Sequence, residues 1–278
     1  MLQATDVWFG YDERVPVLRG VSLSVPPAGM LGILGPNGSG KTTLLRVLAG
    51  TRHPQRGSVS LDGLPLSRFS RADLARRMAV VPQETHLAFD YTAAEIAMMG
   101  RYSHLGPFEI EGPEDIAIVD EALAATGTQH LRDRPFATLS GGEKQRVVIA
   151  SALAQICRDR GSFREKAEGT AGVLLLDEPT ASLDLAYQLD VIALLKQLHD
   201  RQGLAIVIST HDLGLAATLC DRLMLIRSGT VVAAGATDDV LTPENVRTVY
   251  DVEADVVRHP SGQRVVVPVR RAQTRDRP

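Results

Sequence analysis

Residues 30–48 read Met-Leu-Gly-Ile-Leu-Gly-Pro-Asn-Gly-Ser-Gly-Lys-Thr-Thr-Leu-Leu-Arg-Val-Leu and are the most informative segment of the chain. The apolar run Met30–Leu34 predicts a buried strand, and residues 43–48 predict a helix. Between them, residues 35–42 match the pattern G-x-x-x-x-G-K-[ST]. Glycines at these positions let backbone N–H groups wrap a phosphate, and the N-terminus of the following helix adds positive charge. The segment therefore predicts a phosphate-binding loop, called the phosphate loop below.

The residues of this loop have separate tasks in binding a nucleoside triphosphate. We expect the Lys41 ammonium to reach the β- and γ-phosphates and the Thr42 hydroxyl to bind Mg²⁺. The residues expected around the nucleotide are Gly35, Pro36, Asn37, Gly38, Ser39, Gly40, Lys41, Thr42 and Thr43.

Further apolar runs, each bounded by Gly, Pro or Asp, recur along the chain. With the first run they are Met30–Leu34, Ala79–Val81, Val173–Leu176, Ala205–Ile208 and Leu223–Ile226. Runs without polar alternation are typical of strands buried on both faces, so they predict a largely parallel sheet covered by helices, an α/β fold. We expect Val231–Ala234 to pair with the last run as a hairpin. Gln3–Phe9 and Val21–Val25 alternate more and predict antiparallel strands.

A helical pattern interrupts these strands. Ala93–Met99 and Ile116–Thr126 have helical spacing, so we predict a mostly helical subdomain at about residues 84–160, inserted into the sheet domain. Ser140 and Glu143 have the spacing of a capping box and predict that a helix starts there.

Composition excludes several classes of protein. The 278 residues, 44% hydrophobic and 23% charged, are ordinary for a globular chain and exclude disorder or a disulfide scaffold. A formal net charge of -3 provides no field that could hold nucleic acid or an anionic membrane. Cys157 and Cys220 have no metal-ligand spacing and are expected to be structural thiols. Val147–Ile156, the longest nearly apolar stretch, is shorter than the roughly 20 residues of a spanning helix, and Met1–Phe9 lacks an export signal, so we expect a cytosolic chain.

Two adjacent carboxylates follow the apolar run at 173–176. The carboxyl end of a parallel strand is where a ligand site forms in an open α/β sheet. We expect Asp177 to hold Mg²⁺, mostly through water, and Glu178 to orient the water that attacks a γ-phosphate. Alone, a strand ending in Asp-Glu is more typical of the start of a solvated loop. The phosphate loop in the same chain favours the catalytic interpretation.

The segment 139–146, Leu-Ser-Gly-Gly-Glu-Lys-Gln-Arg, resembles the signature motif of the ABC-transporter ATPase family. A simple capped helix is the alternative, but the resemblance extends over nearly the whole chain. It implies a P-loop NTPase fold with a mainly parallel core sheet, an antiparallel β subdomain and an inserted helical subdomain. It also implies one ATPase domain over residues 1–257, followed by a C-terminal extension and polar tail over residues 258–278.

The resemblance implies roles for individual residues. Tyr11 matches the aromatic that stacks on adenine, with a core or turn tyrosine as the alternative. Gln83 matches the Q-loop glutamine near Mg²⁺ and the attacking water. Ser182-Leu183-Asp184 is similar to the D-loop along the dimer interface, and His211 matches the switch histidine that contacts the γ-phosphate. The residues expected to bind the ATP of a second copy are Ser140, Gly141, Gly142 and Glu143.

The family implies ATP and Mg²⁺ as cofactors and ATP hydrolysis coupled to transport. Two copies are expected to enclose two ATP molecules head to tail, so that the Ser140 helix of one subunit faces the Lys41 loop of the other. Closure and reopening of this pair then drive integral-membrane permease subunits. The expected location is peripheral, at the cytoplasmic face of the inner membrane, with no nucleic-acid partner.

Two segments, Met99–Gly106 and Tyr250–Val257, resemble the subfamily that energises uptake of iron-siderophore complexes, heme and vitamin B12 (cobalamin). A periplasmic or lipoprotein solute-binding protein is then an indirect partner. The polar stretch Arg158–Thr170 is longer than usual for the family; a tolerated surface insertion explains it, and heme-uptake members also carry extra residues here.

Two other functions remain open: a soluble single-cassette ATPase in cofactor assembly, and the ATPase subunit of an exporter. If a permease binds the chain, the Gly/Pro-bounded segment after Gln83 is the expected contact. Its apolar and aromatic residues lie near the permease groove or pack inside the helical subdomain. They are Tyr102, His104, Leu105 and Phe108.

Overall fold

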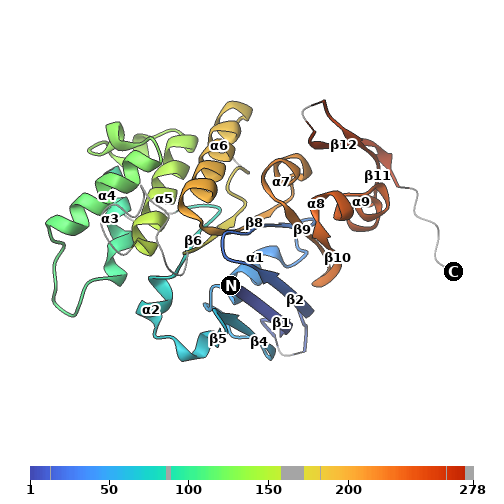
Figure 1. Ribbon diagram of the computed structural model, residues 1–278, viewed down its shortest axis with the longest axis horizontal. Helices are drawn as coiled ribbons and strands as arrows, with labels where there is room; N and C mark the ends of the chain where they lie inside the picture. The colour runs from blue at the N-terminus through green and yellow to red at the C-terminus, as the bar shows by residue number, and fades with distance from the viewer. Residues whose placement is uncertain (13, 86–88, 158–171, 182, 261, 273–278) are drawn as a thin grey trace. The chain divides into compact units, whose positions relative to one another are not determined.

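The structure is a computed structural model of the chain, and it describes all residues except 13, 86–88, 158–171, 182, 261 and 273–278 (Figure 1). Its contacts divide the chain into two units. Unit 1 comprises Met1–Leu2, Pro26–Gly29 and Ser60–Ile206, and unit 2 comprises Gln3–Val25, Met30–Val59 and Val207–Pro278. The stretch Arg158–Thr170 and Ser182 lie outside the described residues.

Unit 2 contains a sheet with the strand order β10-β9-β3-β8. Its strands are β3 (Met30–Leu34), β8 (Ala205–Thr210), which enters from unit 1, β9 (Arg222–Arg227) and β10 (Thr230–Ala236). β3 and β9 are parallel, and β9 and β10 form the expected antiparallel hairpin. All residues of β3 and β8 are buried, which explains why neither strand alternates in polarity.

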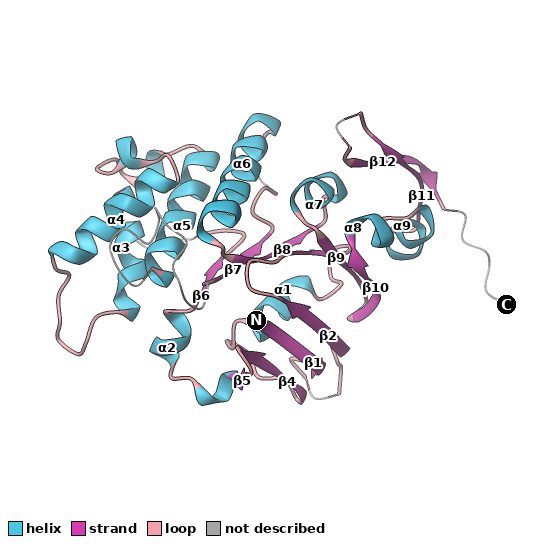
Figure 2. Cartoon of the chain, in the orientation of Figure 1, coloured by secondary structure: helices cyan, strands magenta, loops and turns pink. Residues whose placement is uncertain are grey.

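The remaining elements of unit 2 begin with a second sheet in the order β2-β1-β4. Its strands are β1 (Leu2–Phe9), β2 (Leu18–Val25) and β4 (Arg56–Leu61). The last two residues of β4 belong to unit 1, where they pair antiparallel with β5 (Leu64–Pro65). The helices of unit 2 are α1 (Lys41–Leu48), α7 (Leu213–Leu219), α8 (Thr237–Val240) and α9 (Pro243–Tyr250) (Figure 2). β1 and β2 alternate between buried and exposed residues, as their sequences predict.

Unit 1 contains the parallel strands β6 (Met78–Val81) and β7 (Val173–Asp177) and most of the helices. These helices are α2 (Arg71–Ala75), α3 (Ala93–Met98), α4 (Pro113–Ala125), α5 (Gly141–Ile156) and α6 (Leu185–Gln202). Four 3-10 turns, η1 to η4, connect them: Leu66–Arg68, Met99–Ser103, Gln129–Leu131 and Phe136–Thr138. α3, α4 and α5 pack against one another (Figure 1).

The sequence signals for helix ends are present in the structure. Thr92 and Ser140 each form a capping box at the start of α3 and α5, and Pro113 and Pro243 occupy the first turns of α4 and α9. Both cysteines are buried, as expected for structural thiols. Among the described residues, none of the helices has the length and apolar composition needed to span a membrane.

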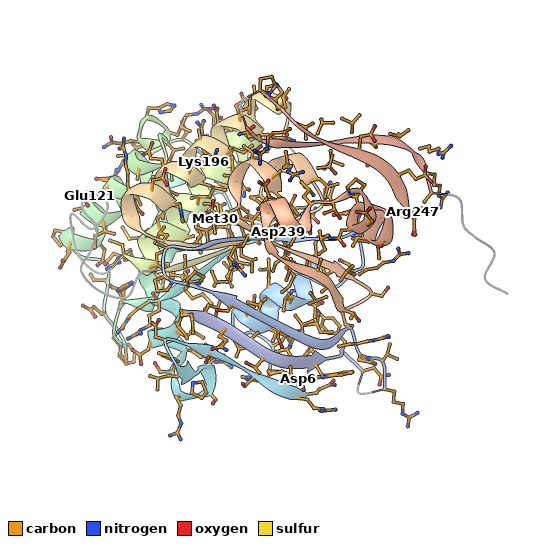
Figure 3. All side chains as sticks on the ribbon, turned by 45° about the vertical axis from the view of Figure 1, so that its right-hand side comes forward. Asp6, Met30, Glu121, Lys196, Asp239 and Arg247 are labelled. Atoms are coloured by element: carbon orange, nitrogen blue, oxygen red, sulfur yellow. The ribbon has the colours of Figure 1, made fainter. Side chains whose placement is uncertain are left out.

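The C-terminal segment contains an element that the sequence analysis missed. Residues 258–278, expected to be an extension and polar tail, include β12 (Arg264–Arg271), which pairs antiparallel with β11 (Val252–Arg258). The two strands pair from Val252 opposite Arg271 to Arg258 opposite Arg264, and Asp238 of α8 accepts from Arg258 at 2.7 Å and from Arg264 at 2.9 Å. Figure 3 shows the side chains of unit 2, including Asp239 in α8 and Arg247 in α9. Part of the expected extension therefore forms a strand, and Arg264 of this strand pairs with Asp238 of α8.

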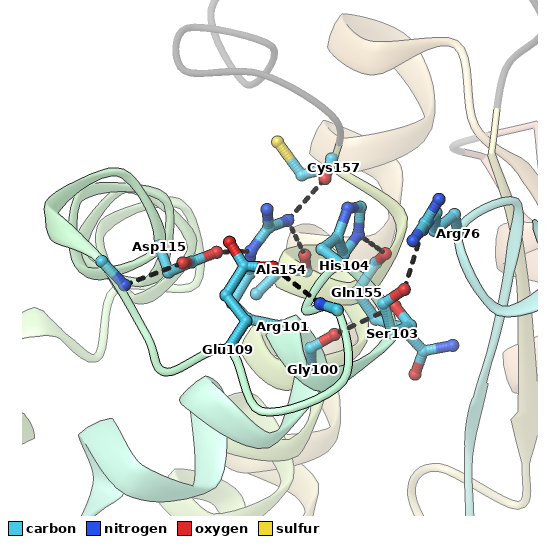
Figure 4. A network of polar contacts seen from close by, with 12 residues as sticks. Arg76, Gly100, Arg101, Ser103, His104, Glu109, Asp115, Ala154, Gln155 and Cys157 are labelled. Carbon is cyan, nitrogen blue, oxygen red and sulfur yellow. Dashed lines mark hydrogen bonds and ion pairs between the residues drawn. The ribbon is translucent and has the colours of Figure 1, made fainter. Parts of the chain in front are cut away.

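A buried arginine ties three helical elements of unit 1 together (Figure 4). Arg101 is 4% exposed and donates from Nε to Asp115 Oδ1 at 2.9 Å. Its Nη1 donates to the carbonyl oxygens of Ala154 at 2.9 Å and Cys157 at 2.7 Å, at the end of α5. Although burial alone raises the pKa of Asp115, the Gly112 N–H and Arg101 hold it below its ordinary value.

We expect Arg101→Ala to lower the free energy of unfolding by about 3–5 kcal/mol, because it removes the buried cation that donates to the Asp115 carboxylate and to two carbonyls. Urea unfolding followed by circular dichroism measures this change. Arg132→Ala is the matched control: Arg132 donates to Asp120 at 2.7 Å, but their side chains are 38% and 36% exposed. That change is expected to cost at most about 1 kcal/mol. Equal losses in the two variants would contradict the role of Arg101.

Candidate nucleotide site

The phosphate loop connects β3 to α1 in unit 2, as the sequence predicts. Gly40 occupies the N-cap of α1 with φ 105°, a conformation that side-chain-bearing residues rarely adopt. No side chain caps this helix, so its first N–H groups point to the loop without an internal side-chain acceptor. A helix start of this kind is a ready site for an anion.

Two further donors of the loop fit a polyphosphate. The Lys41 side chain is buried and donates from Nζ to the carbonyl oxygens of Gly35 at 2.9 Å and Pro36 at 3.3 Å. The Ser39 hydroxyl is also buried, and in the described part of the chain it has no hydrogen-bond partner. A buried hydroxyl without a partner is costly, and a phosphate oxygen is a suitable acceptor for it. The residues present therefore fit the triphosphate that the motif predicts.

Tyr11 lies beside the first turns of α1. Its Oη is 3.4 Å from Thr43 Oγ1 and accepts a hydrogen bond from Arg46 Nη1 at 3.1 Å. The hydrogen bond with Thr43 and then that with Arg46 lower the pKa of Tyr11. The ring stands edge-on to Phe9 and is 58% exposed, which excludes a core tyrosine and leaves a face available for stacking. Sequence reasoning missed Arg46; its spacing of three residues from Thr43 on a helix was the available signal.

His211 follows β8, which is the neighbour of β3 in the sheet of unit 2. His211 is exposed, while the next residue, Asp212, caps α7 by accepting from Leu215 N at 3.0 Å. The Asp212 N–H in turn donates to Thr210 Oγ1 at 3.0 Å. These two bonds fix the backbone on the C-terminal side of His211, so its position after β8 is well defined.

Unit 1 brings the predicted water-activating residues to one end of a strand pair. β6 and β7 are parallel with Val81 opposite Leu176, so Gln83 and Glu178 follow neighbouring strand ends. Asp177 is the last residue of β7 and is 7% exposed. Glu178 has φ 46°, a left-handed conformation that costs about 1–2 kcal/mol for a residue with a side chain. Strain of this kind is found at functional sites.

Each residue expected at Mg²⁺ carries an oxygen of the kind that this ion binds. Within the described ranges, no group of three or more His, Cys, Asp or Glu could hold a metal. Mg²⁺ does not need such a group, because it usually binds one or two carboxylates together with substrate phosphates and water. Thr42 in unit 2 supplies a hydroxyl oxygen, and Asp177 and Gln83 in unit 1 supply side-chain oxygens.

The signature segment forms the start of α5 in unit 1. Ser140 Oγ accepts from Glu143 N at 3.3 Å, and Glu143 Oε2 accepts from Ser140 N at 2.8 Å. The Ser140 N–H holds the pKa of Glu143 below its ordinary value. Gly141 is exposed and Gly142 is buried. The expected capping box is confirmed, and the exposed glycine leaves the helix start open to an anion.

The D-loop region leads into α6 of the same unit. Asp184 is exposed and occupies the N-cap of α6, where its side chain forms no capping hydrogen bond. Leu183 N donates to Thr180 O at 3.1 Å, which folds the segment back on the end of β7. Of the three residues that resemble the D-loop, the structure describes Leu183 and Asp184, whereas Ser182 lies outside the described residues.

A family model described as ABC transporter matches residues 18–158. The chain belongs to the ABC transporter family. It is 43% identical over 254 residues to the hemin import ATP-binding protein HmuV of Gloeobacter violaceus, covering 91% of this chain and 89% of the relative. It is 39% identical over 251 residues to the cobalamin import ATP-binding protein BtuD of Halobacterium salinarum, covering 90% of this chain and 59% of that protein.

Solved ABC transporter structures have the same fold. A metal-chelate type ABC transporter in an inward-facing conformation matches with a TM-score of 0.80 at 27% identity, covering 96% of both chains. A dimeric bacterial ABC transporter cassette matches with a TM-score of 0.69 at 25% identity, covering 85% of this chain and 99% of that one. The predicted α/β ABC ATPase fold and the predicted subfamily are confirmed, and the chain is an ABC-type ATPase that binds ATP.

Proposed function

We propose that this chain is the ATP-binding and ATP-hydrolysing subunit that powers import of an iron chelate (siderophore or heme) or cobalamin through a partner permease. The observation that carries the proposal is the 43% identity, over 91% of the chain, to a hemin import ATP-binding protein. A cobalamin import relative at 39% identity supports the same class of large chelates.

The phosphate loop binds the triphosphate in this proposal. Backbone N–H groups at the start of α1, the Ser39 hydroxyl and the Lys41 ammonium are the donors for the phosphates. The exposed ring of Tyr11 stacks on adenine, and Arg46 fixes that ring through its hydroxyl. Lys41 is already held over the loop by the Gly35 and Pro36 carbonyls, so little side-chain entropy is lost on binding.

Hydrolysis depends on the ends of β7 and β8. Glu178 orients the attacking water and accepts its proton, and His211 contacts the γ-phosphate. Thr42, Gln83 and Asp177 hold Mg²⁺, which neutralises charge on the β- and γ-phosphates when bound. The left-handed backbone of Glu178 supports this role, because strained conformations of this kind are found at functional sites.

Two copies complete the two sites. The start of α5, with Ser140, Gly141, Gly142 and Glu143, faces the ATP on the Lys41 loop of the other copy, and Asp184 lies along the interface between the copies. One ATPase domain over 1–257, with a helical subdomain at about 84–160, supplies all these parts. The pair binds permease subunits as a peripheral complex at the cytoplasmic face of the cell membrane, and a solute-binding protein delivers the chelate.

Co-isolation from native membranes tests the proposal. A tagged Glu178→Gln chain, purified with ATP and Mg²⁺, is expected to bring a permease with many membrane spans and, with it, a solute-binding protein carrying a chromophoric chelate. Soluble partners alone would overturn import in favour of cofactor assembly. A permease whose complex transports outward would overturn it in favour of export.

An exposed aromatic turn is the expected permease contact. Phe108 is fully exposed with φ 66°, in a turn closed by Glu109 N donating to Gly106 O at 3.1 Å. Tyr102 is 56% exposed, whereas His104 packs inside the helical subdomain with Nε2 bonded to Gln155 O at 2.7 Å. Of the two alternatives, Tyr102 and Phe108 thus fit a contact surface and His104 fits internal packing, while Leu105 is half-buried and is compatible with both.

We expect Tyr102→Asp combined with Leu105→Asp to reduce recovery of the permease by about tenfold, because charges replace apolar contact area. Quantitative pull-down of the permease from solubilised membranes measures the loss. ATP binding by the isolated subunit serves as the control and should not change. Unchanged recovery of the permease would contradict this contact surface.

A further inference from the structure

A glycine of the signature segment lies against a tyrosine of the next helix in unit 1. A Cβ atom added to Gly142 would lie 2.5 Å from Cδ1, 2.8 Å from Cγ and 3.0 Å from Cβ of Tyr187. These distances are shorter than any real van der Waals contact between carbon atoms, and Gly142 is buried. The ring of Tyr187 therefore fills the space that any larger residue at position 142 would need.

The first turn of α6, which carries Tyr187, is bonded to the segment that follows Glu178. Gln188, its neighbour in the first turn of α6, donates from Nε2 to Leu183 O at 3.0 Å and to Thr180 O at 3.5 Å. Ala181 N donates to Glu178 O at 3.2 Å. These hydrogen bonds form a continuous path from Glu178 to the first turn of α6. The ring of Tyr187 extends that path to the start of α5.

Other contacts between the start of α5 and α6 are weak. The Nη1 of Arg146 is 3.8 Å from Asp190 Oδ2, and Asp190 is 55% exposed, so this ion pair contributes little. The Nε of Arg146 and the Nε2 of Gln145 have no hydrogen-bond partner within the described residues. The close approach of the Tyr187 ring to Gly142 is therefore better suited than this exposed ion pair to set the spacing between the two helix starts.

We infer that Tyr187 is a positioning residue for ATP hydrolysis, whose ring fixes the signature segment relative to the segment after Glu178. Gly142 lacks a side chain because Tyr187 occupies that space, in addition to any need for close approach to a phosphate. This inference rests on the proposed function, in which the start of α5 binds the ATP of a second copy. The link then joins the water-orienting residue of one ATP site to the ATP-binding helix start of the other.

A pair of substitutions that adds a methyl group at position 142 and removes the ring at position 187 tests this contact. In a Glu178→Gln background, ATP-dependent dimer formation is measured by analytical ultracentrifugation, and ATP binding by the monomer is measured separately with a fluorescent ATP analogue. Gly142→Ala is expected to weaken dimer formation by about 100-fold and Tyr187→Ala by about tenfold, both with unchanged monomer binding. Gly142→Ala combined with Tyr187→Ala is expected to dimerise at least about tenfold better than Gly142→Ala alone, because the ring no longer meets the added Cβ.

Two controls separate positioning from general damage. Tyr187→Phe keeps the ring and should dimerise like the background protein. Gly141→Ala changes an exposed glycine, so Tyr187→Ala should not rescue it. Far-UV circular dichroism and the unfolding midpoint verify that each variant is folded.

The outcomes are distinct. Full dimer formation by Gly142→Ala with Tyr187 intact, or a double variant no better than Gly142→Ala, would overturn the inference. Rescue of Gly141→Ala by Tyr187→Ala would also overturn it, since the effect would not be specific to the contact. A background protein that binds ATP without dimerising would instead overturn the proposed head-to-tail site itself.

Discussion

Replacing Glu178 with glutamine is expected to lower the steady-state ATPase rate by about 10²- to 10⁴-fold while ATP binding is retained. Glutamine has nearly the same shape as glutamate but cannot accept a proton from the attacking water. Because Glu178 lies at the end of β7 and not on the phosphate loop, the donors that hold the triphosphate are unchanged. ATP is therefore bound without being consumed, and the dimer that it stabilises accumulates.

Turnover of ATP by the variant, measured with the permease present, checks this expectation together with the dimer fraction in ATP. Glu244→Gln is the control, since Glu244 is exposed in the first turn of α9 and belongs to no part of the proposed site. ATPase activity near that of the unmodified chain in Glu178→Gln would refute the assignment of Glu178 as the base.

Replacing Lys41 with alanine is expected to weaken ATP binding by about 10- to 100-fold, because a charge-assisted hydrogen bond to phosphate is worth about 1.5–3 kcal/mol. The Lys41 side chain is buried over the loop and donates to two of its carbonyls, so alanine also removes donors that hold the loop in its binding conformation. Both effects lower the affinity for ATP, so the loss appears in binding and does not require hydrolysis.

Equilibrium titration with a fluorescent ATP analogue measures this loss. Lys196→Ala is the matched control, because Lys196 lies within α6, away from both helix ends (Figure 3). Tight ATP binding by Lys41→Ala would contradict the proposed role of the phosphate loop. The two variants fail differently: Glu178→Gln holds ATP and cannot consume it, whereas Lys41→Ala does not hold it.

Several parts of the fold could be predicted from the sequence because their signals are local. The buried strands β3, β7 and β8 are short apolar runs without polar alternation, and the phosphate loop is a contiguous motif between a strand and a helix. The capping box of Ser140 and Glu143 needs only residues three apart.

The C-terminal hairpin and the buried Arg101 could not be predicted in this way. In the hairpin, Arg258 and Arg264 each pair with Asp238, which lies 20 and 26 residues away in the chain. Arg101 depends on carbonyls 53 and 56 residues away, at the end of α5. Charged residues are normally exposed, so the residue type alone predicts a surface position for Arg101. Its burial becomes understandable only when its partners are known.

The sequence by itself determined the family, the α/β class, the phosphate loop and the identity of the residues expected at ATP, since each of these is encoded by residue type at short spacing. Only the tertiary structure decided which distant residues share space: Tyr11 with Arg46, Asp238 with two arginines, and Tyr187 with Gly142. The physical reason is that folding brings residues from distant parts of the chain into close-packed contact. A single sequence gives the residue types but not which of them come into contact.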